Sequence, residues 1–281
     1  MEKNIYLIGD TGEYNLHTYQ IFNNINNDCS EDDCIIMLGD NFYPTGINSE
    51  YNYKWTCIKD IKLKIPIYPV MGNHDYLSID PYAQFKHTTI CKDYQWNMYN
   101  FYYSITVNNC DIFFIDTQIL QPNYTNLNEK YMDSILYNFH NVRKNMINWL
   151  NLELSKSNRR KIVVGHYPLA TVGIYKNNKV LYDILIPIFT KYNVELYISG
   201  HEHSLQINNI LDKDTNKPLL KQLVSGSGSS IYNYFSHVEN TDNYIKFLCH
   251  GHIKLTTYTT NSNIEITIID EKNNILHTEI I

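Results

Sequence analysis

The sequence lacks long hydrophobic runs and an excess of basic residues, and each absence excludes a class of protein. No apolar run approaches the roughly 20 residues that a membrane-spanning helix needs. The chain has 23 lysine and arginine residues against 29 aspartate and glutamate residues, and the resulting net charge of −6 offers no basic surface for nucleic acid. We therefore expect neither a membrane nor a nucleic acid among its partners.

Paired cysteines are also missing. The six cysteines are scattered along the chain without a C-x-x-C pair, which excludes a zinc knuckle. Only four apolar residues separate Asn4 from Gly9, and this leaves no room for a signal peptide. Without an export signal we expect reduced thiols, a cytoplasmic location and a monomer.

Short apolar runs alternate with helical stretches over the first 200 residues, and this order is typical of an α/β fold. We predict strands at residues 5–8, 34–38, 67–70, 112–115, 162–164 and 196–198, and helices at 14–25, 144–154 and 180–192. The last third alternates apolar and polar residues, which predicts antiparallel strands at 219–224, 252–258 and 264–269. No repeat, linker or charge block marks a boundary, so we predict one domain spanning residues 1–281.

Five of the predicted strands lead to a glycine followed by a side chain that can bind a metal. These side chains are Asp10, Asp40, Asn73, His166 and the pair His201 and His203. The carboxyl ends of successive α/β strands converge on one edge of the sheet, so we expect these groups to meet. A single Gly-Asp at a strand end is usually a turn, but five such motifs in one chain are hard to explain as turns.

The segment from Gly39 to Gly46 predicts what kind of metal centre they form. The carboxylate of Asp40 can bridge two cations, and Tyr43, three residues later, can direct its phenolate toward one of them. Phenolate is a hard, strongly donating ligand that favours Fe(III) over zinc or magnesium. The segment therefore predicts a two-metal centre in which one ion is ferric iron.

Each of these residues also has a structural interpretation. His201 and His203 fit a solvated turn, Tyr43 an ordinary packed tyrosine, Asn73 a turn residue and His74 a core histidine. These interpretations weaken because the neighbouring motifs repeat the same order of strand, glycine and metal-binding side chain.

Two other segments resemble sites, but we interpret them as structural. The segment His250-Gly251-His252 fits a turn into a strand better than a metal site. The serine and glycine run from Ser225 to Ser229 lacks the lysine and following helix of a P-loop, so we predict a strand-end loop that lines the site.

The motif order GDTG, GDNFYPTG, GNHD, GHYP and GHEH resembles the metallophosphoesterase superfamily. The position of Tyr43 narrows the resemblance to purple acid phosphatases, and the length to their small mammalian, tartrate-resistant type. The resemblance implies a four-layer sandwich of two mixed sheets flanked by helices. It also implies that Asp10, Tyr43 and His203 hold Fe(III), that Asn73, His166 and His201 hold a divalent iron, zinc or manganese ion, and that Asp40 bridges the two.

The activity implied by the resemblance is hydrolysis of phosphate monoesters by in-line attack of a metal-bound hydroxide. His74 would protonate the leaving group, and Asp75 would orient His74. The substrate would be a phosphorylated small molecule or a phosphoprotein, contacted by Asn73, His74 and His201. Tyr175 would contact it too, because it stands where the mammalian enzymes carry a phosphate-binding histidine.

Two alternatives stay open on the same scaffold. One is a phosphodiesterase or nucleotide pyrophosphatase with manganese or zinc in both sites, and the other is a catalytically silent scaffold that binds a protein partner. The complete set of ligand residues argues against the scaffold. Residues 121–141 correspond to a regulatory, protease-sensitive loop in the family, which makes this segment a candidate regulatory loop.

Overall fold

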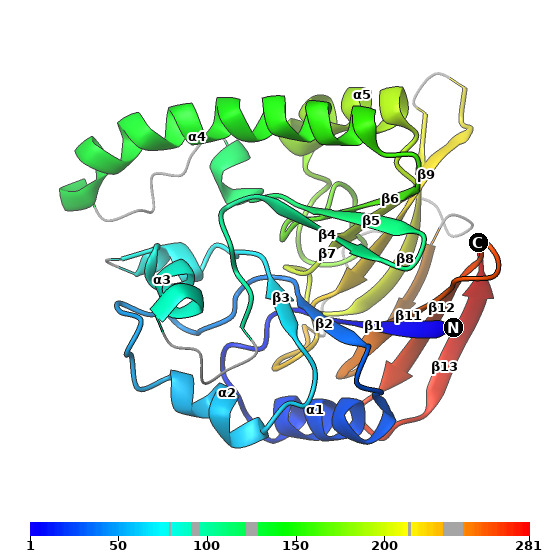
Figure 1. The fold of residues 1–281 in the computed structure, drawn as a ribbon, viewed down its shortest axis with the longest axis horizontal. Helices are drawn as coiled ribbons and strands as arrows, with labels where there is room; N and C mark the ends of the chain where they lie inside the picture. Colours follow the sequence, from blue (N-terminus) through cyan, green and yellow to red (C-terminus); the bar gives the residue numbers. More distant parts are fainter. Residues whose placement is uncertain (79, 91–95, 122–128, 213–214, 233–243) are drawn as a thin grey trace.

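Two sheets lie face to face in the middle of the molecule, and helices cover their outer faces (Figure 1). The computed structural model describes all residues except 79, 91–95, 122–128, 213–214 and 233–243, and it leaves out the side chains of 129–140. Helices α4 (Glu129–Lys156) and α5 (Lys179–Tyr192) cover one outer face, and α1 (Leu16–Asp28) and α2 (Trp55–Ile61) lie on the opposite side. This arrangement confirms the predicted sandwich of two mixed sheets flanked by helices.

The first sheet has the strand order β13-β12-β11-β1-β2-β3. Its strands are β1 (Glu2–Ile8), β2 (Cys34–Met37), β3 (Ile67–Pro69), β11 (Gly251–Tyr258), β12 (Ile264–Asp270) and β13 (Ile275–Ile280). Strands β1, β2 and β3 are parallel, whereas β11, β12 and β13 pair in antiparallel fashion. Strands β11 and β12 confirm the antiparallel strands predicted at 252–258 and 264–269. The strand predicted at 219–224 lies in the second sheet, where it is antiparallel to one neighbour and parallel to the other.

The second sheet has the order β10-β8-β9-β7-β6-β5-β4. Its strands are β4 (Tyr103–Val107), β5 (Cys110–Phe114), β6 (Arg160–Val164), β7 (Leu196–Ser199), β8 (Leu205–Leu211), β9 (Pro218–Ser225) and β10 (Tyr244–Phe247). Strands β5, β6, β7 and β9 are parallel, and β4, β8 and β10 are antiparallel to their neighbours. Both sheets are therefore mixed.

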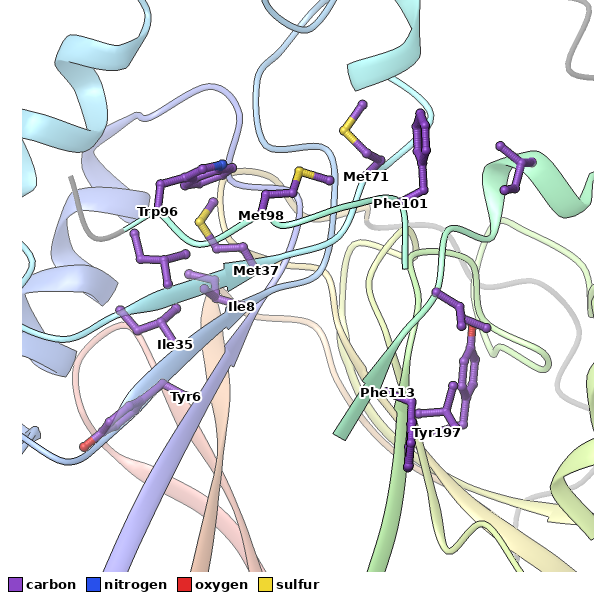
Figure 2. Close-up of a cluster of buried hydrophobic side chains, with 14 of the residues drawn as sticks. Tyr6, Ile8, Ile35, Met37, Met71, Trp96, Met98, Phe101, Phe113 and Tyr197 are labelled. Carbon is purple, nitrogen blue, oxygen red and sulfur yellow. The ribbon is translucent and has the colours of Figure 1, made fainter. Parts of the chain in front are cut away.

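The central strands are apolar on both faces because each face packs against a different layer. Along β1, Ile5 and Leu7 belong to the core between the two sheets, whereas Tyr6 and Ile8 belong to the core beneath the helices. Figure 2 shows Tyr6 and Ile8 with other side chains of this second core. A strand covered on both faces reads as a continuous apolar run, and this is why the sequence predicted β1.

Side-chain caps explain where two of the helices begin. The Asn15 carboxamide oxygen accepts the backbone N–H groups of His17 and Thr18 at the start of α1, and Asn178 accepts that of Leu181 at the start of α5. None of the described helices has both the length and the apolar character that crossing a bilayer requires.

Three findings add to or correct the sequence predictions. The strands β4, β8, β10 and β13 and the helices α2 and α3 (Ala83–Ile90) were not predicted. The segment 121–141 is not a loop throughout, because α4 begins at Glu129, and residues 122–128 lie outside the described part. The apolar residues at 132, 135, 136 and 139 have helical spacing, which accounts for the longer helix. The five cysteines that the structure describes are free thiols.

Candidate metal centre

The candidate site lies where the carboxyl edges of the two sheets meet. Strands β1, β2 and β3 of the first sheet and β6 and β7 of the second each lead into one of the glycine motifs. Hydrogen bonds cross from sheet to sheet at this edge. His166 Nδ1 lies 2.7 Å from the carbonyl oxygen of Leu38, and the backbone N–H of His201 donates to Asp10 Oδ2 over 2.8 Å. The two edges are thereby fixed against each other.

Three buried side chains form the centre of the site. The ligand atoms of Asp10, Asp40 and His166 all lie within 4.8 Å of one another. The Tyr43 hydroxyl lies 3.2 Å from Asp10 Oδ1, 3.1 Å from Asp40 Oδ2 and 3.3 Å from His203 Nε2. Groups more than 190 residues apart in the sequence therefore meet here.

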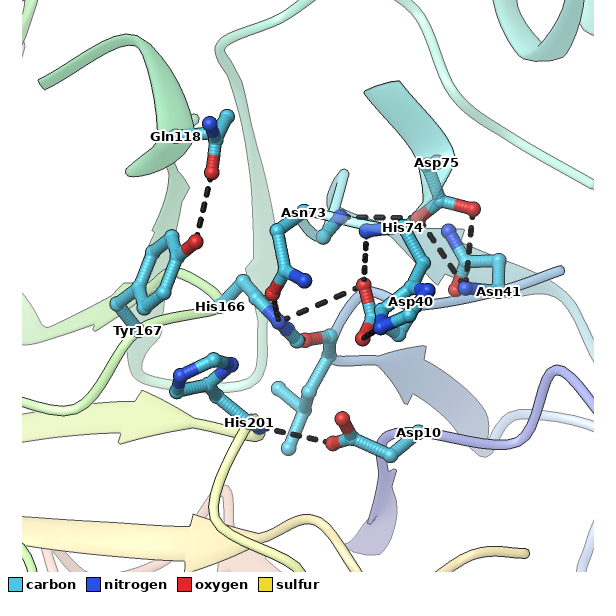
Figure 3. A network of polar contacts seen from close by, with 12 residues as sticks. Asp10, Asp40, Asn41, Asn73, His74, Asp75, Gln118, His166, Tyr167 and His201 are labelled. Atoms are coloured by element: carbon cyan, nitrogen blue, oxygen red, sulfur yellow. Dashed lines mark hydrogen bonds and ion pairs between the residues drawn. The ribbon is translucent and has the colours of Figure 1, made fainter. Parts of the chain in front are cut away.

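The remaining two predicted ligands border the same centre. The amide oxygen of Asn73 lies 3.1 Å from His166 Nε2, and Asp40 Oδ1 lies 3.6 Å from the same nitrogen (Figure 3). The rings of His166 and His201 have centroids 5.1 Å apart. All seven predicted metal ligands thus surround one point, and their roles as ligands stay a prediction.

The contacts at His166 fit a bound cation. Its Nδ1–H donates to the Leu38 carbonyl, so a neutral imidazole turns the lone pair of Nε2 toward the oxygens of Asn73 and Asp40. Three acceptors that face one another are unfavourable unless a proton or a cation lies among them. As metal ligands, these nitrogen and oxygen atoms suit divalent iron, zinc and manganese.

The pKa shifts of the acidic groups also indicate that the site favours a bound cation. Burial would raise the pKa of Asp10, but the hydrogen bond with His203 and the charges of the nearby histidines hold it below its ordinary value. Burial and the charge of Asp10 raise the pKa of Asp40 despite the opposing effect of His166. Burial and the two carboxylates raise the pKa of the Tyr43 hydroxyl far above its ordinary value. A phenolate at Tyr43 therefore requires a cation beside it.

The histidines divide by their neighbours. Burial, together with His166, lowers the pKa of His201 well below its ordinary value, so this ring is neutral and its lone pair is available. Burial also opposes a charge on His166 and His203, but Asp40 and Asp10 outweigh burial and raise both pKa values. A bound cation would take the place of these protons.

The backbone at the site is held in conformations that side chains rarely adopt. Asp10, Asp40 and His201 have φ angles of 57°, 52° and 66°, in the left-handed region. Strain of this kind costs about 1–3 kcal/mol per residue and clusters at functional sites. Gly72 is required for close approach, because a Cβ there would lie 2.2 Å from Asp40 Oδ1.

Residues 3–205 of the chain match the family model described as calcineurin-like phosphoesterase. The chain belongs to this family. Membership implies a dinuclear metal centre, as the convergence of the seven side chains also suggests.

Individual relatives of this phosphoesterase are acid phosphatases. The chain is 29% identical to purple acid phosphatase 7 of Arabidopsis thaliana over an alignment of 261 residues. This alignment covers 87% of this chain and 74% of the relative. The chain is 30% identical over 189 residues to human tartrate-resistant acid phosphatase type 5, which covers 62% of this chain and 56% of the human protein. These relatives confirm the resemblance to purple acid phosphatases.

Two solved structures share the fold of this phosphoesterase. GAP50, the anchor in the inner membrane complex of Plasmodium, aligns with a TM-score of 0.78 at 21% identity, over 99% of this chain and 88% of that one. A purple acid phosphatase from yellow lupin seeds aligns with a TM-score of 0.71 at 16% identity, over 100% of this chain and 53% of that one. At these identities the likeness shows the fold alone.

His74 lies at the mouth of the phosphoesterase site. Its backbone N–H donates to Asp40 Oδ1 over 2.8 Å, and its ring Nδ1 lies 2.7 Å from the carbonyl oxygen of Pro44. The side chain is 36% exposed, and Nε2 lies 4.0 Å from Asp40 Oδ2. Pro44 therefore fixes the ring and directs Nε2 toward the centre.

The predicted role of Asp75 in orienting His74 is wrong. Both oxygens of the buried Asp75 carboxylate accept backbone N–H groups, from Asn41, Phe42 and Gly72. The carboxylate thus ties the loop after β2 to the loop after β3. It holds the backbone around Asp40 in place, and the ring of His74 is held by a carbonyl group that the sequence could not single out.

Tyr175, predicted to contact substrate, covers one side of the centre. Its ring stacks on His201 with centroids 4.1 Å apart, and Tyr232 stacks on His203 at the same distance. The hydroxyl groups of the two tyrosines interact with each other. Tyr232 was not predicted, since nothing in its sequence neighbourhood distinguishes it from the other tyrosines.

Two positioning residues were also missed. Thr117 Oγ1 accepts the backbone N–H groups of His166 and Tyr167 over 3.1 and 3.0 Å. Ser230 Oγ lies 2.6 Å from His203 Nδ1. A signal for Thr117 existed, because it follows β5, a neighbour of β6 whose carboxyl end reaches the same edge.

The two segments interpreted as structural have that character. Gly251 begins β11, which confirms a turn into a strand, and His252 is buried against Tyr6 with ring centroids 5.9 Å apart. Ser225 ends β9, and the Ser229 hydroxyl donates to the backbone carbonyl of Asp10. The serine and glycine run therefore lines the site, as predicted.

The structure has a pocket of about 480 Å³ away from the metal centre, at the amino ends of β5 and β6. It is larger than the pocket of about 310 Å³ beside His201. Its charged groups pair with one another, Arg159 with Asp111 and Lys156 with Glu153. Size alone therefore does not mark the functional site in this molecule.

Proposed function

We propose that this chain is a dinuclear metal-dependent phosphatase that hydrolyses phosphate monoesters of small molecules or of phosphoproteins. The observation that carries the proposal is the convergence of Asp10, Asp40 and His166, which come from both sheets of a phosphoesterase fold. Its acid phosphatase relatives support the choice of monoesters.

Asp10, Tyr43 and His203 would hold Fe(III), and Asn73, His166 and His201 would hold divalent iron, zinc or manganese. The orientation of Asp40 supports its role as the bridge. Its Oδ2 lies 3.1 Å from the Tyr43 hydroxyl, on the ferric side, and its Oδ1 lies 3.6 Å from His166 Nε2, on the divalent side. When bound, such a pair of cations supplies Lewis acidity to the phosphate and a nucleophile for in-line displacement.

His74 would protonate the leaving oxygen. With Nδ1–H donated to the Pro44 carbonyl, a protonated His74 carries its second proton on Nε2, the nitrogen nearer the centre. The partial exposure of the ring allows it to exchange protons with solvent between turnovers. Proton transfer by a positioned side chain contributes about 10²–10⁴-fold to a rate.

The test uses two monoesters with different leaving groups on the metal-loaded protein. We expect His74→Ala to lower kcat for glycerol 2-phosphate, whose alkoxide needs a proton, by about 10²-fold or more. The loss for p-nitrophenyl phosphate is smaller, because p-nitrophenolate leaves without a proton. His277→Ala, on the far strand β13, is the control and leaves both rates unchanged. Equal losses for both esters would refute the acid role of His74.

The same assay separates the alternatives. A phosphodiesterase would hydrolyse bis(p-nitrophenyl) phosphate faster than the monoester, with zinc or manganese present in both sites. A scaffold, the alternative suggested by the fold likeness to an anchor protein, would retain no metal after expression with iron and zinc supplied. Either result would overturn the proposed phosphatase.

A further inference from the structure

A pocket of about 310 Å³ opens beside His201. The wall next to the metal centre is aromatic, since the rings of Tyr167 and Tyr175 lie 4.3 and 4.1 Å from the His201 ring. Residues 176–180 also line the pocket, and among them are Lys176 and Lys179. One pocket therefore contains both a predicted metal ligand and two cationic side chains.

The walls of this pocket are held from behind. The buried Glu202 carboxylate accepts the backbone N–H groups of Ile174 and Tyr175 over 3.3 and 3.2 Å. Gly173 packs so closely on the same carboxylate that a Cβ there would lie 2.0 Å from it. The Tyr167 hydroxyl donates to Gln118 Oε1 over 2.8 Å. The pocket is preformed, and this role explains why a glutamate stands between the two histidines of the last motif.

The charge of the pocket differs from that of the chain. The protein has a net charge of −6, but the described residues that line this pocket include two lysines and no carboxylate. Lys176 is exposed, and Lys179 pairs with Asp183 one helical turn further along α5. A pair between exposed side chains is weak, so Lys179 can exchange Asp183 for a stronger anion.

We propose that this pocket receives the leaving group of the substrate and that this leaving group carries a second phosphate. The inference rests on the proposed phosphatase function. In the reaction, the bond between phosphorus and the leaving oxygen breaks, a water oxygen forms the new bond to phosphorus, and a proton passes to the leaving oxygen. The carbon part of the leaving group packs between Tyr167 and Tyr175, and its second phosphate binds Lys176 and Lys179. Substrates of this class include bisphosphorylated small molecules.

The test compares phenyl phosphate with 4-phosphonophenyl phosphate, which adds one anion that cannot be hydrolysed. For the metal-loaded protein we expect a KM about tenfold lower for the phosphonate-bearing ester, with little change in kcat. A tenfold change corresponds to about 1.4 kcal/mol. The preference falls as salt rises, because the Debye length shortens from about 10 Å at 0.1 M to about 3 Å at 1 M.

The double variant Lys176→Gln/Lys179→Gln loses this preference and keeps its kcat for phenyl phosphate. The matched control is Lys156→Gln/Lys217→Gln. It removes two exposed lysines away from the site, Lys156 shortly before β6 and Lys217 just before β9. Like Lys179, Lys156 pairs with a carboxylate of its own helix, that of Glu153. The control keeps the preference for the phosphonate-bearing ester.

Calorimetric binding of phenylphosphonate and benzene-1,4-bisphosphonate gives a second readout without turnover. We expect the bisphosphonate to bind the wild type about tenfold more tightly and the double lysine variant with no advantage. A wild type that hydrolyses phenyl phosphate but shows neither preference would refute the pocket assignment and leave the phosphatase intact. A metal-loaded wild type that hydrolyses neither ester would refute the phosphatase itself, and with it the substrate class inferred here.

Discussion

Thr117→Val tests whether the fold positions the metal site through a single buried hydroxyl group. Valine has nearly the shape of threonine, so the substitution removes the oxygen without opening a cavity. The Thr117 hydroxyl accepts the N–H groups of His166 and Tyr167, and Thr117 and His166 are fully buried. Valine would leave both N–H groups without this acceptor.

The expected loss follows from the cost of unsatisfied buried donors. Each costs about 1–3 kcal/mol, so Thr117→Val lowers the free energy of unfolding by about 2–6 kcal/mol. Thr117→Ser is the control, since it keeps the oxygen and loses one methyl group. That loss is worth about 1 kcal/mol. Urea denaturation of the metal-free protein measures both variants, and an unchanged slope confirms that their transitions are comparable.

The order of stability decides the outcome. We expect the wild type to be most stable, Thr117→Ser to be slightly less stable and Thr117→Val to be least stable. If Val is as stable as Ser, the loop after β6 finds other acceptors. Thr117 would then not be what positions His166.

Three further predictions concern the metal centre and the core. We expect iron-loaded protein to show a visible charge-transfer band from the Tyr43 phenolate. Tyr43→Phe abolishes this band, whereas the control Tyr175→Phe retains it. A colourless wild type would remove the case for a ferric site. Burial raises the pKa of Asp116 to about 7, so its protonated form stabilises the fold below about pH 4 and this contribution is lost as pH rises to about 7. Asp116→Asn therefore gains stability relative to wild type by a few kcal/mol between these pH values, measured by urea denaturation, and a constant difference would contradict the raised pKa. Adding metal to the chelated protein at 100 times its dissociation constant raises the free energy of unfolding by about 2.7 kcal/mol, read as a higher Tm, and Asp40→Asn shows a much smaller gain.

Strands that are buried on both faces were predicted from the sequence. β1, β2, β6 and β7 are buried over most or all of their length and appear as uninterrupted apolar runs. β8 was missed because its buried residues include Gln206 and Asn208, which bind the backbone of residues 170–172. Such a strand can be recognised only when the loop that satisfies its amides is known.

In the candidate site, too, the residues that strands position were predicted and those that loops position were missed. Its seven predicted ligands lie within about six residues of a strand end, so the edge of the sheets determines where they meet. The orienting groups, by contrast, act through a carbonyl at Pro44 or hydroxyl groups at Thr117 and Ser230. Their positions depend on the path of each loop, and one residue type serves many such paths. The error at Asp75 had this origin, since proximity in sequence to His74 does not determine where a carboxylate points.

The proposed ligand sets have a consequence for how the two sheets are held together. Each cation would take ligands from both sheets. For the ferric ion, Asp10 and Tyr43 follow strands of the first sheet and His203 follows a strand of the second. For the divalent ion, Asn73 follows a strand of the first sheet, and His166 and His201 follow strands of the second. Metal binding would therefore cross-link the two edges in the folded state. The hydrogen bonds from His166 to Leu38 and from His201 to Asp10 also join the edges. The apolar core between the sheets joins them as well. Metal binding would therefore add to contacts that already join the edges where the strained backbone of Asp10, Asp40 and His201 lies.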